Sequence, residues 1–182
     1  ERIDPKVKLF QEAVKTVIEK ATEYIAAELE KSNRRNDPQA FTMYLQVWLL
    51  SWNSGWTKEF FCDLFAVYVL GPAFAWSHLH LAATRGGDAF QVPLIGVGQT
   101  HPPDAARMTA ILDGLTLIGF EAEAYEIEQK WESLLSTSSS KLSPEYGRCF
   151  PRQLLKFVAE TVLEATKSLN CRIVSTQTNS DI

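Results

Sequence analysis

The segment from Trp56 to Thr84 constrains the fold most, because apolar residues occupy nearly every side of the helix that it would form. A helix that is apolar all round is stable only when other elements cover it, so this one must lie at the centre. Gly71-Pro72 falls in its middle, where proline removes a backbone hydrogen bond and clashes with the preceding turn. The sequence therefore predicts a central helix that is broken at Gly71-Pro72 and surrounded by other helices.

Two carboxylates interrupt this apolar segment. Glu59 and Asp63 are four residues apart, a spacing that places both side chains on one face of a helix. A carboxylate that leaves water must be paired, protonated or bound to a metal ion. Four basic side chains follow in the sequence and could supply a partner: His78, His80, His101 and Arg107. We expect both acids to be buried and this polar cluster to be the centre of the protein, either as structure or as chemistry.

Apolar residues with helical spacing predict five further helices around the central one. They span residues 5–31, 39–52, 104–118, 121–135 and 151–169. Four of them follow an aspartate or proline start signal, at Asp4-Pro5, Asp37-Pro38, Pro102-Pro103 and Phe150-Pro151. The predicted fold class is therefore all-α, a compact bundle of about six helices that forms a single domain over residues 1–174.

The connections are predicted from their glycine, proline, asparagine and serine content. Asn53-Ser54-Gly55 is predicted to form a turn into the central helix, and residues 89–100 an irregular loop. The serine-rich residues 136–143 are expected to form a mobile surface loop. Residues 175–182 are expected to be a disordered tail, preceded by a short strand at 172–174 if other parts of the protein supply a partner for it.

Composition narrows the class of function. The 182 residues suffice for one domain with a substantial core, and 46% hydrophobic and 22% charged residues are ordinary for a globular protein. The net charge of -4 argues against nucleic-acid binding, which requires a basic face. Lys58, Glu59 and Asp63 interrupt the most apolar region, so no segment reaches the roughly 18 apolar residues of a membrane-spanning helix.

The three cysteines, Cys62, Cys149 and Cys171, are scattered and lack the spacing of metal ligands. We therefore expect reduced thiols and a cytoplasmic location. Cys62 lies in the apolar segment, where burial raises the pKa of a thiol, so it is not expected to be a nucleophile. The chain begins with Glu1 rather than Met and shows no signal-peptide pattern, from which we expect a piece of a longer protein.

Two other patterns receive a structural interpretation. A set of aromatic residues at helical spacing is predicted to lie in the core or at a helix interface rather than to form a ligand-binding cage. These residues are Trp48, Trp52, Trp56, Phe60 and Phe61. The acidic run from Glu121 to Glu132 is predicted to be a solvated helix face.

Two motifs occur in order along the chain. Glu59 and Asp63 give E-x-x-x-D in an apolar helix, and His101, Pro102 and Arg107 give H-P-x-x-x-x-R at the head of a later helix. This ordered pair resembles gluzincin metallopeptidases of the HtpX and CAAX-prenyl-endopeptidase type, and the resemblance covers about a third of the chain. It implies that Glu59 stands where those peptidases have their third zinc ligand, and that Asp63 and Arg107 have supporting roles.

The chain departs from that family in one respect that decides the chemistry. The peptidases need H-E-x-x-H upstream, in which two histidines hold zinc and the glutamate acts as general base. This sequence has three histidines, and none of them precedes Glu59. The family's zinc site therefore cannot form from this chain alone. Either the chemistry has been lost, or the missing ligands lie outside this fragment.

Two arrangements of the polar cluster remain open. In the first, Glu59, Asp63 and His101, with one of the two histidines at 78 and 80, bind zinc, manganese or iron. Those two histidines are two residues apart on a helix, so both cannot face Glu59. In the second, Arg107 makes a bidentate contact with Asp63 or Glu59, and His101 donates to the other acid, which joins two helices.

Two hypotheses of function follow. In one, the chain is a non-catalytic gluzincin-like helical domain that needs no cofactor and acts as a scaffold or interaction module, with another protein or a second copy as its partner. In the other, it is a metal-dependent, peptidase-like hydrolase in which Glu59 ligates zinc and Asp63 orients a ligand. There His101 and Arg107 are the catalytic candidates, which stabilise an oxyanion or hold the substrate.

Overall fold

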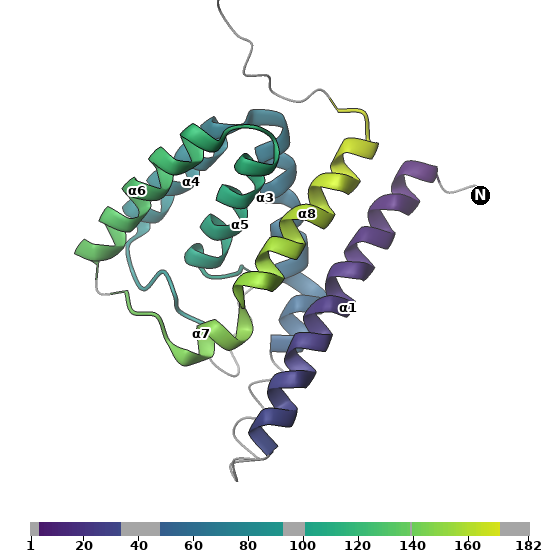
Figure 1. Ribbon diagram of the computed structural model, residues 1–182, viewed down its shortest axis with the longest axis horizontal. Coiled ribbons are helices and arrows are strands. Elements are labelled where there is room, and N and C mark those ends of the chain that lie inside the picture. Colours follow the sequence, from purple (N-terminus) through teal and green to yellow (C-terminus); the bar gives the residue numbers. More distant parts are fainter. Residues whose placement is uncertain (1–3, 34–47, 93–100, 139, 172–182) are drawn as a thin grey trace, which may run out of the picture.

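The structure is a computed structural model that describes residues 4–33, 48–92, 101–138 and 140–171. Within these residues the fold is all-α and contains no strand, which confirms the predicted class (Figure 1). Its elements are α1 (Pro5–Asn33), the π-helical turn η1 (Trp52–Trp56), α3 (Thr57–Leu70), α4 (Pro72–Arg85), α5 (Asp104–Leu117), α6 (Glu121–Thr137), α7 (Pro144–Cys149) and α8 (Arg152–Ser168). Within the described residues, no helix is both long and apolar enough to cross a membrane.

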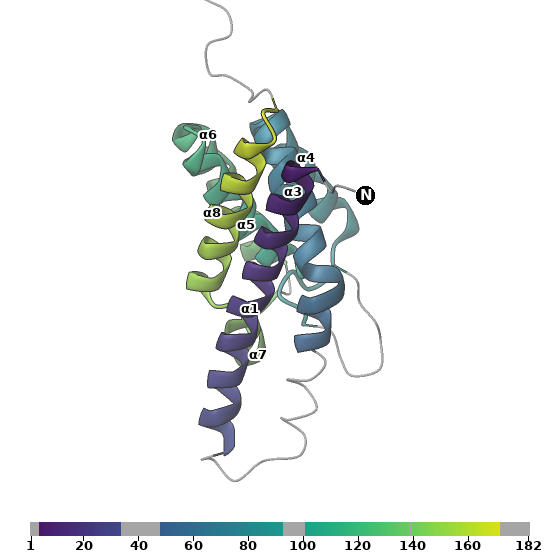
Figure 2. The same cartoon turned by 90° about the vertical axis from the view of Figure 1, so that its right-hand side faces the viewer.

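The helices pack around α3, α5 and α8, each of which contacts the other two. Helix α1 lies along α8, and its C-terminal half extends beyond the rest of the bundle (Figures 1 and 2). Helices α4 and α6 contact each other and cover α5 from the other side. Asp4 begins α1 as predicted, since its Oδ1 accepts a hydrogen bond of 2.8 Å from the backbone N–H of Lys6.

The predicted break in the central helix is confirmed. Helix α3 ends at Gly71, whose N–H bonds to the Val67 carbonyl at 2.8 Å, and α4 begins with Pro72. Gly71 has a φ of 58°, a left-handed conformation that glycine adopts without the steric cost of a Cβ atom. Two consecutive helices of the bundle therefore come from one apolar segment.

The predicted turn at Asn53-Ser54-Gly55 is wrong. Residues 48–51 are helical, and the chain continues through the π-helical turn η1 directly into α3. The widened turn is held by Thr57, whose hydroxyl donates a 2.6 Å hydrogen bond to the Trp52 carbonyl. The indoles of Trp52 and Trp56 are fully buried, and their packing outweighs the local turn preference of the residues between them.

The core confirms the structural interpretation of the aromatic residues. Trp48, Trp52, Trp56, Phe60 and Phe61 are all buried. The ring of Trp52 stacks on that of Phe60 with centroids 5.4 Å apart. The Trp52 ring also contacts that of Phe150, just before α8, with centroids 5.6 Å apart.

Helices α3 and α5 cross at close range because α5 carries Gly114 at the crossing. A Cβ atom at Gly114 would lie 2.8 Å from Leu64 Cδ2 and 3.3 Å from Val67 Cγ1. A Cβ atom at 2.8 Å is closer than real Cβ contacts, so a larger residue here would require the Leu64 side chain or the helices to shift. The close crossing brings the polar side chains of α3 within reach of those at the head of α5.

The remaining expectations divide into two groups. The other helices and the breaks between them lie where they were predicted, and the short helix α7 was not predicted. Parts of four further predictions lie outside the described residues: the helix over 39–47, the loop over 93–100, the strand at 172–174 and the tail at 175–182.

Candidate functional site

The centre of the site is a bidentate ion pair between Asp63 on α3 and Arg107 on α5. Arg107 Nε donates to Asp63 Oδ2 and its Nη2 donates to Oδ1, both at 2.7 Å. The two side chains are 4% and 12% exposed, so the pair is largely desolvated. Burial alone would lower the pKa of Arg107, but the hydrogen bonds and the charge of Asp63 outweigh it and raise that pKa. The predicted bidentate contact is confirmed.

The second acid pairs with the loop before α5. His101 Nδ1 lies 2.9 Å from Glu59 Oε2, and the same oxygen is 3.9 Å from Arg107 Nη2. Arg107 therefore lies between the two carboxylates, and the predicted contact of His101 with the second acid is confirmed. The expectation that Glu59 is buried is wrong, because its carboxylate lies near the N-terminal end of α3 and is about a quarter exposed (27%).

His78, one of the four predicted partners, lies beside this network but contacts neither Glu59 nor Asp63. His78 on α4 is 3% exposed, and among the described residues its Nε2 atom has no hydrogen-bond partner. The nearest carboxylate oxygen is Asp104 Oδ1 at 3.9 Å, and that oxygen accepts a 2.7 Å hydrogen bond from Arg85. Burial and the positive charge of Arg107 lower the pKa of His78, against the smaller effects of Asp63 and Asp104.

A sequence signal for the Asp104 contact does exist. Arg85 is in the last turn of α4 and Asp104 is in the first turn of the next helix, α5. Opposite charges at the end of one helix and the start of the next become neighbours when the connecting loop folds back. His80, the remaining candidate partner, is exposed on α4 and takes part neither in the network around Arg107 nor in the Arg85–Asp104 contact.

Two hollows border the cluster. The larger has a volume of about 440 Å³ and is lined by Arg85, His101, Asp104 and Arg107, together with residues 86–88. Its arginines are already bound to carboxylates, Arg85 to Asp104 and Arg107 to Asp63. Any group that enters this hollow would therefore meet arginines that are already paired.

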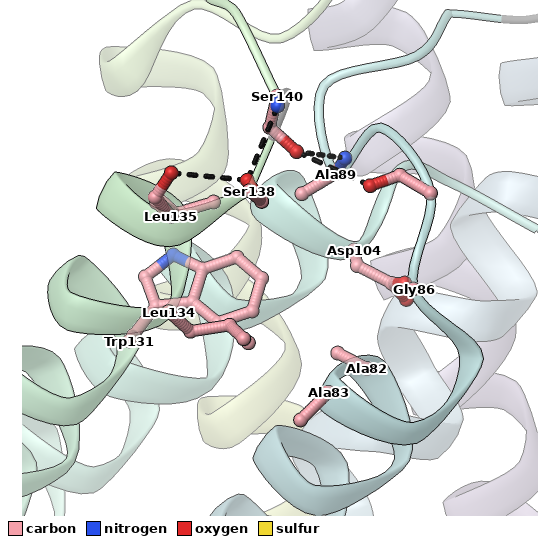
Figure 3. Close-up of a pocket in the computed structure, with 11 residues that line it drawn as sticks. Ala82, Ala83, Gly86, Ala89, Asp104, Trp131, Leu134, Leu135, Ser138 and Ser140 are labelled. Atoms are coloured by element: carbon pink, nitrogen blue, oxygen red, sulfur yellow. Dashed lines mark hydrogen bonds between the residues drawn. The ribbon is translucent and has the colours of Figure 1, made fainter.

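The smaller hollow, of about 40 Å³, lies between the end of α4 and the end of α6 (Figure 3). Ser140 closes it, since its hydroxyl accepts from the Ala89 N–H at 2.9 Å and contacts the Gly87 carbonyl at 3.3 Å. The volume admits no more than a few water molecules. Part of the serine-rich segment that was expected to form a mobile loop is thus tied to the loop after α4, and its first two residues belong to α6.

The described residues do not by themselves fit a zinc site. In the part of the chain that the structure describes, no group of three or more His, Cys, Asp or Glu side chains is placed to hold a metal ion. Both oxygens of Asp63 are bound by Arg107, and Glu59 faces His101. The metal set of Glu59, Asp63 and His101 stays a prediction, which would require ligands from outside the described residues.

Cys62 lies between these acids in the sequence, directly before Asp63, but it is not an activated thiol. It is exposed rather than buried, contrary to expectation. Partial desolvation and the negative charges of Glu59 and Asp63 nevertheless raise its pKa, which disfavours the thiolate.

Comparisons of the chain with protein-family models, with curated proteins and with solved structures found no match. The likeness to gluzincins therefore stays a prediction from two short motifs.

Proposed function

We propose that this chain is a non-catalytic helical scaffold or interaction module, similar to the third-ligand half of a gluzincin, in which the two acids join helices. The observation that carries the proposal is the bidentate pair of Asp63 and Arg107 across the α3–α5 crossing. A carboxylate with both oxygens bound to a guanidinium has little capacity left for another ligand. Its contacts are those of a structural element.

The second acid extends the same connection. Glu59 contacts His101 in the loop just before α5, so the two acids hold the head of α5 at two successive points. The close approach at Gly114 fixes the helices further along. A rigid crossing of this kind suits a scaffold that presents the outer helix faces in fixed positions.

Two variants and one measurement test the proposal. Asp63→Ala should destabilise the fold strongly, because it leaves the Arg107 charge buried without a partner. Glu59→Ala should lower the free energy of unfolding, and its effect on folding should exceed its effect on any activity that the protein shows. Elemental analysis of the intact gene product should find no stoichiometric zinc or manganese. Stoichiometric metal that is lost in Glu59→Ala would contradict the proposal.

The alternative is a metal-dependent, peptidase-like hydrolase, which the order of the two motifs and one feature of the site favour. Glu59 and His101 contact each other, and both are partly exposed at the surface. In this alternative Glu59 would contribute one ligand, and the others would come from residues outside the described part. An H-E-x-x-H motif elsewhere in the full-length protein would favour the hydrolase.

We also propose a cytoplasmic location. Cys62, Cys149 and Cys171 are all free thiols. Unpaired cysteines are typical of proteins kept in a reducing compartment. The test is the distribution of the tagged gene product between the soluble and membrane fractions and the culture medium.

A further inference from the structure

The groove between α5 and α6 has the features of a docking site. It has a volume of about 540 Å³ and is lined along one face of each helix. Residues Ala105, Thr109, Leu112 and Thr116 line it from α5, and Ala124, Tyr125, Glu128, Trp131, Glu132 and Leu135 from α6. The stretch of α5 involved is about 16 Å long at 1.5 Å per residue, which corresponds to three helical turns.

The floor of the groove is apolar and partly open. Trp131 is buried at its base, while Leu112 and Leu135 are half-buried beside it. Tyr125 is 65% exposed, although it is a large aromatic side chain that usually packs against other groups. Exposed aromatic and aliphatic groups within a concave surface are typical of places where a partner side chain inserts.

The rim of the groove is acidic. Glu121, Glu128 and Glu132 line it, and none of them forms a salt bridge with any residue that the structure describes. The fourth acid, Asp113, is neutralised by Arg152 at the start of α8. The lining therefore carries an excess of three negative charges, which attracts a cationic partner and repels nucleic acid or an anionic membrane surface.

We propose that this groove binds a short, basic amphipathic helix of another protein. Such a helix would place its apolar stripe on Tyr125 and Leu112, and its lysines or arginines would reach Glu121, Glu128 and Glu132. The long basic side chains can cover apolar surface with their stems while their charged ends meet the rim. The inference rests on the proposed function as an interaction module, and it specifies the class of partner.

Isothermal titration calorimetry with a synthetic probe tests this inference. The probe is a peptide of about 14 residues, or four helical turns, with leucine along one face and lysine on both flanks. A matched peptide carries glutamate in place of each lysine. At about 0.15 M salt, we expect one lysine peptide to bind per chain with a micromolar Kd, and the glutamate peptide not to bind.

Matched variants separate the groove from general charge attraction. Glu128→Lys/Glu132→Lys should weaken binding by roughly tenfold or more, and Tyr125→Ala should also weaken it. The control Glu126→Lys/Glu160→Lys makes the same change in net charge at exposed positions outside the groove, and it should alter Kd by less than about twofold. Thermal melts should confirm that all three variants fold.

Three results would overturn the inference: no saturable binding, equal weakening by the two double variants, or a chain that dimerises through this groove. In the last case light scattering would detect a dimer that Tyr125→Ala converts to a monomer. The proposed function fails separately, through stoichiometric metal bound at Glu59. The peptide result does not depend on that outcome, because the groove variants do not touch the Asp63–Arg107 pair.

Discussion

Helix α5 takes part in two arginine–aspartate pairs that have the same chemistry and different surroundings. Arg107 on α5 meets Asp63 of α3 with side chains 12% and 4% exposed, whereas Asp113 on α5 meets Arg152 of α8 with side chains 15% and 59% exposed. Both contacts are bidentate. The comparison teaches that burial, rather than contact geometry, should decide how much the fold depends on each pair.

The largest expected effect comes from breaking the buried pair. Asp63→Ala should lower the free energy of unfolding by about 3–5 kcal/mol, because the Arg107 charge is left without a partner in a desolvated position. Asp113→Ala should cost no more than about 1 kcal/mol, since Arg152 can return to water. Urea unfolding monitored by circular dichroism measures both. Equal losses from the two variants would contradict the role given to burial.

Removing both partners sharpens the same comparison. Asp63→Leu/Arg107→Met replaces the buried pair by apolar groups. The double variant should therefore be more stable than Asp63→Leu alone, by about 2 kcal/mol or more in the free energy of unfolding. The corresponding cycle with Asp113→Ala and Arg152→Ala should give a coupling energy below about 1 kcal/mol. If Asp63→Leu/Arg107→Met is no more stable than Asp63→Leu alone, the loss of stability does not come from an unpaired Arg107 charge.

The close crossing that positions the buried pair can be tested at Gly114. Gly114→Ala should destabilise by about 1–3 kcal/mol, because the new methyl group would lie 2.8 Å from Leu64 Cδ2 in a packed core. Gly147→Ala is the matched control, since a Cβ there meets nothing within 4 Å. In helix α7 the control should be neutral or stabilising by up to about 1 kcal/mol. If Gly114→Ala leaves the free energy of unfolding unchanged, helices α3 and α5 can move apart at the crossing without loss of stability.

Stability should also respond to pH through His78, which is buried on α4. Its pKa is lowered in the folded state, so at low pH the unfolded chain binds a proton more readily than the folded one. The stabilisation is complete above the unfolded pKa of about 6.5 and is lost as the pH falls below it toward the folded pKa. Stability should therefore decline as the pH falls below about 7, with a slope of at most about 1.4 kcal/mol per pH unit from this group.

The variant His78→Gln isolates this contribution, because glutamine does not titrate. Its unfolding free energy should fall less steeply with decreasing pH than that of the parent chain. His80→Gln, on the exposed side of the same helix, is the control and should keep the parent slope. If both variants keep it, the buried imidazole does not govern the acid sensitivity.

The sequence predicted one of these two pairs and not the other, for a physical reason. The all-α class, the break at Gly71-Pro72 and the Asp63–Arg107 contact could be predicted, because an acid in an apolar segment must find a counter-charge. The Asp113–Arg152 pair could not, because no apolar segment marks Asp113 as an acid that needs a partner, and nothing local shows that the head of α8 lies beside α5. Proximity of that kind depends on the packing of distant helices.

The errors within the site have a related origin. Helix α3 is apolar on almost every side, so its sequence does not mark which side other helices leave open. Burial was therefore expected for both Glu59 and Cys62, and both lie toward the open side. The Arg85–Asp104 contact joins the end of α4 to the start of α5, and the sequence of neither helix alone indicates that these two ends lie together.

The smallest expected effect is the salt dependence of the two pairs. Raising the salt concentration from about 0.1 M to about 1 M shortens the screening length to roughly 3 Å, which weakens interactions between solvated charges. The small cost of Asp113→Ala should then approach zero, because Arg152 is mostly in water. The cost of Asp63→Ala should change much less, because the Asp63 and Arg107 side chains are only 4% and 12% exposed and salt screens a largely desolvated pair weakly. Loss of both effects at high salt would place the Asp63–Arg107 pair in contact with solvent, and the distinction between the two pairs would then no longer hold.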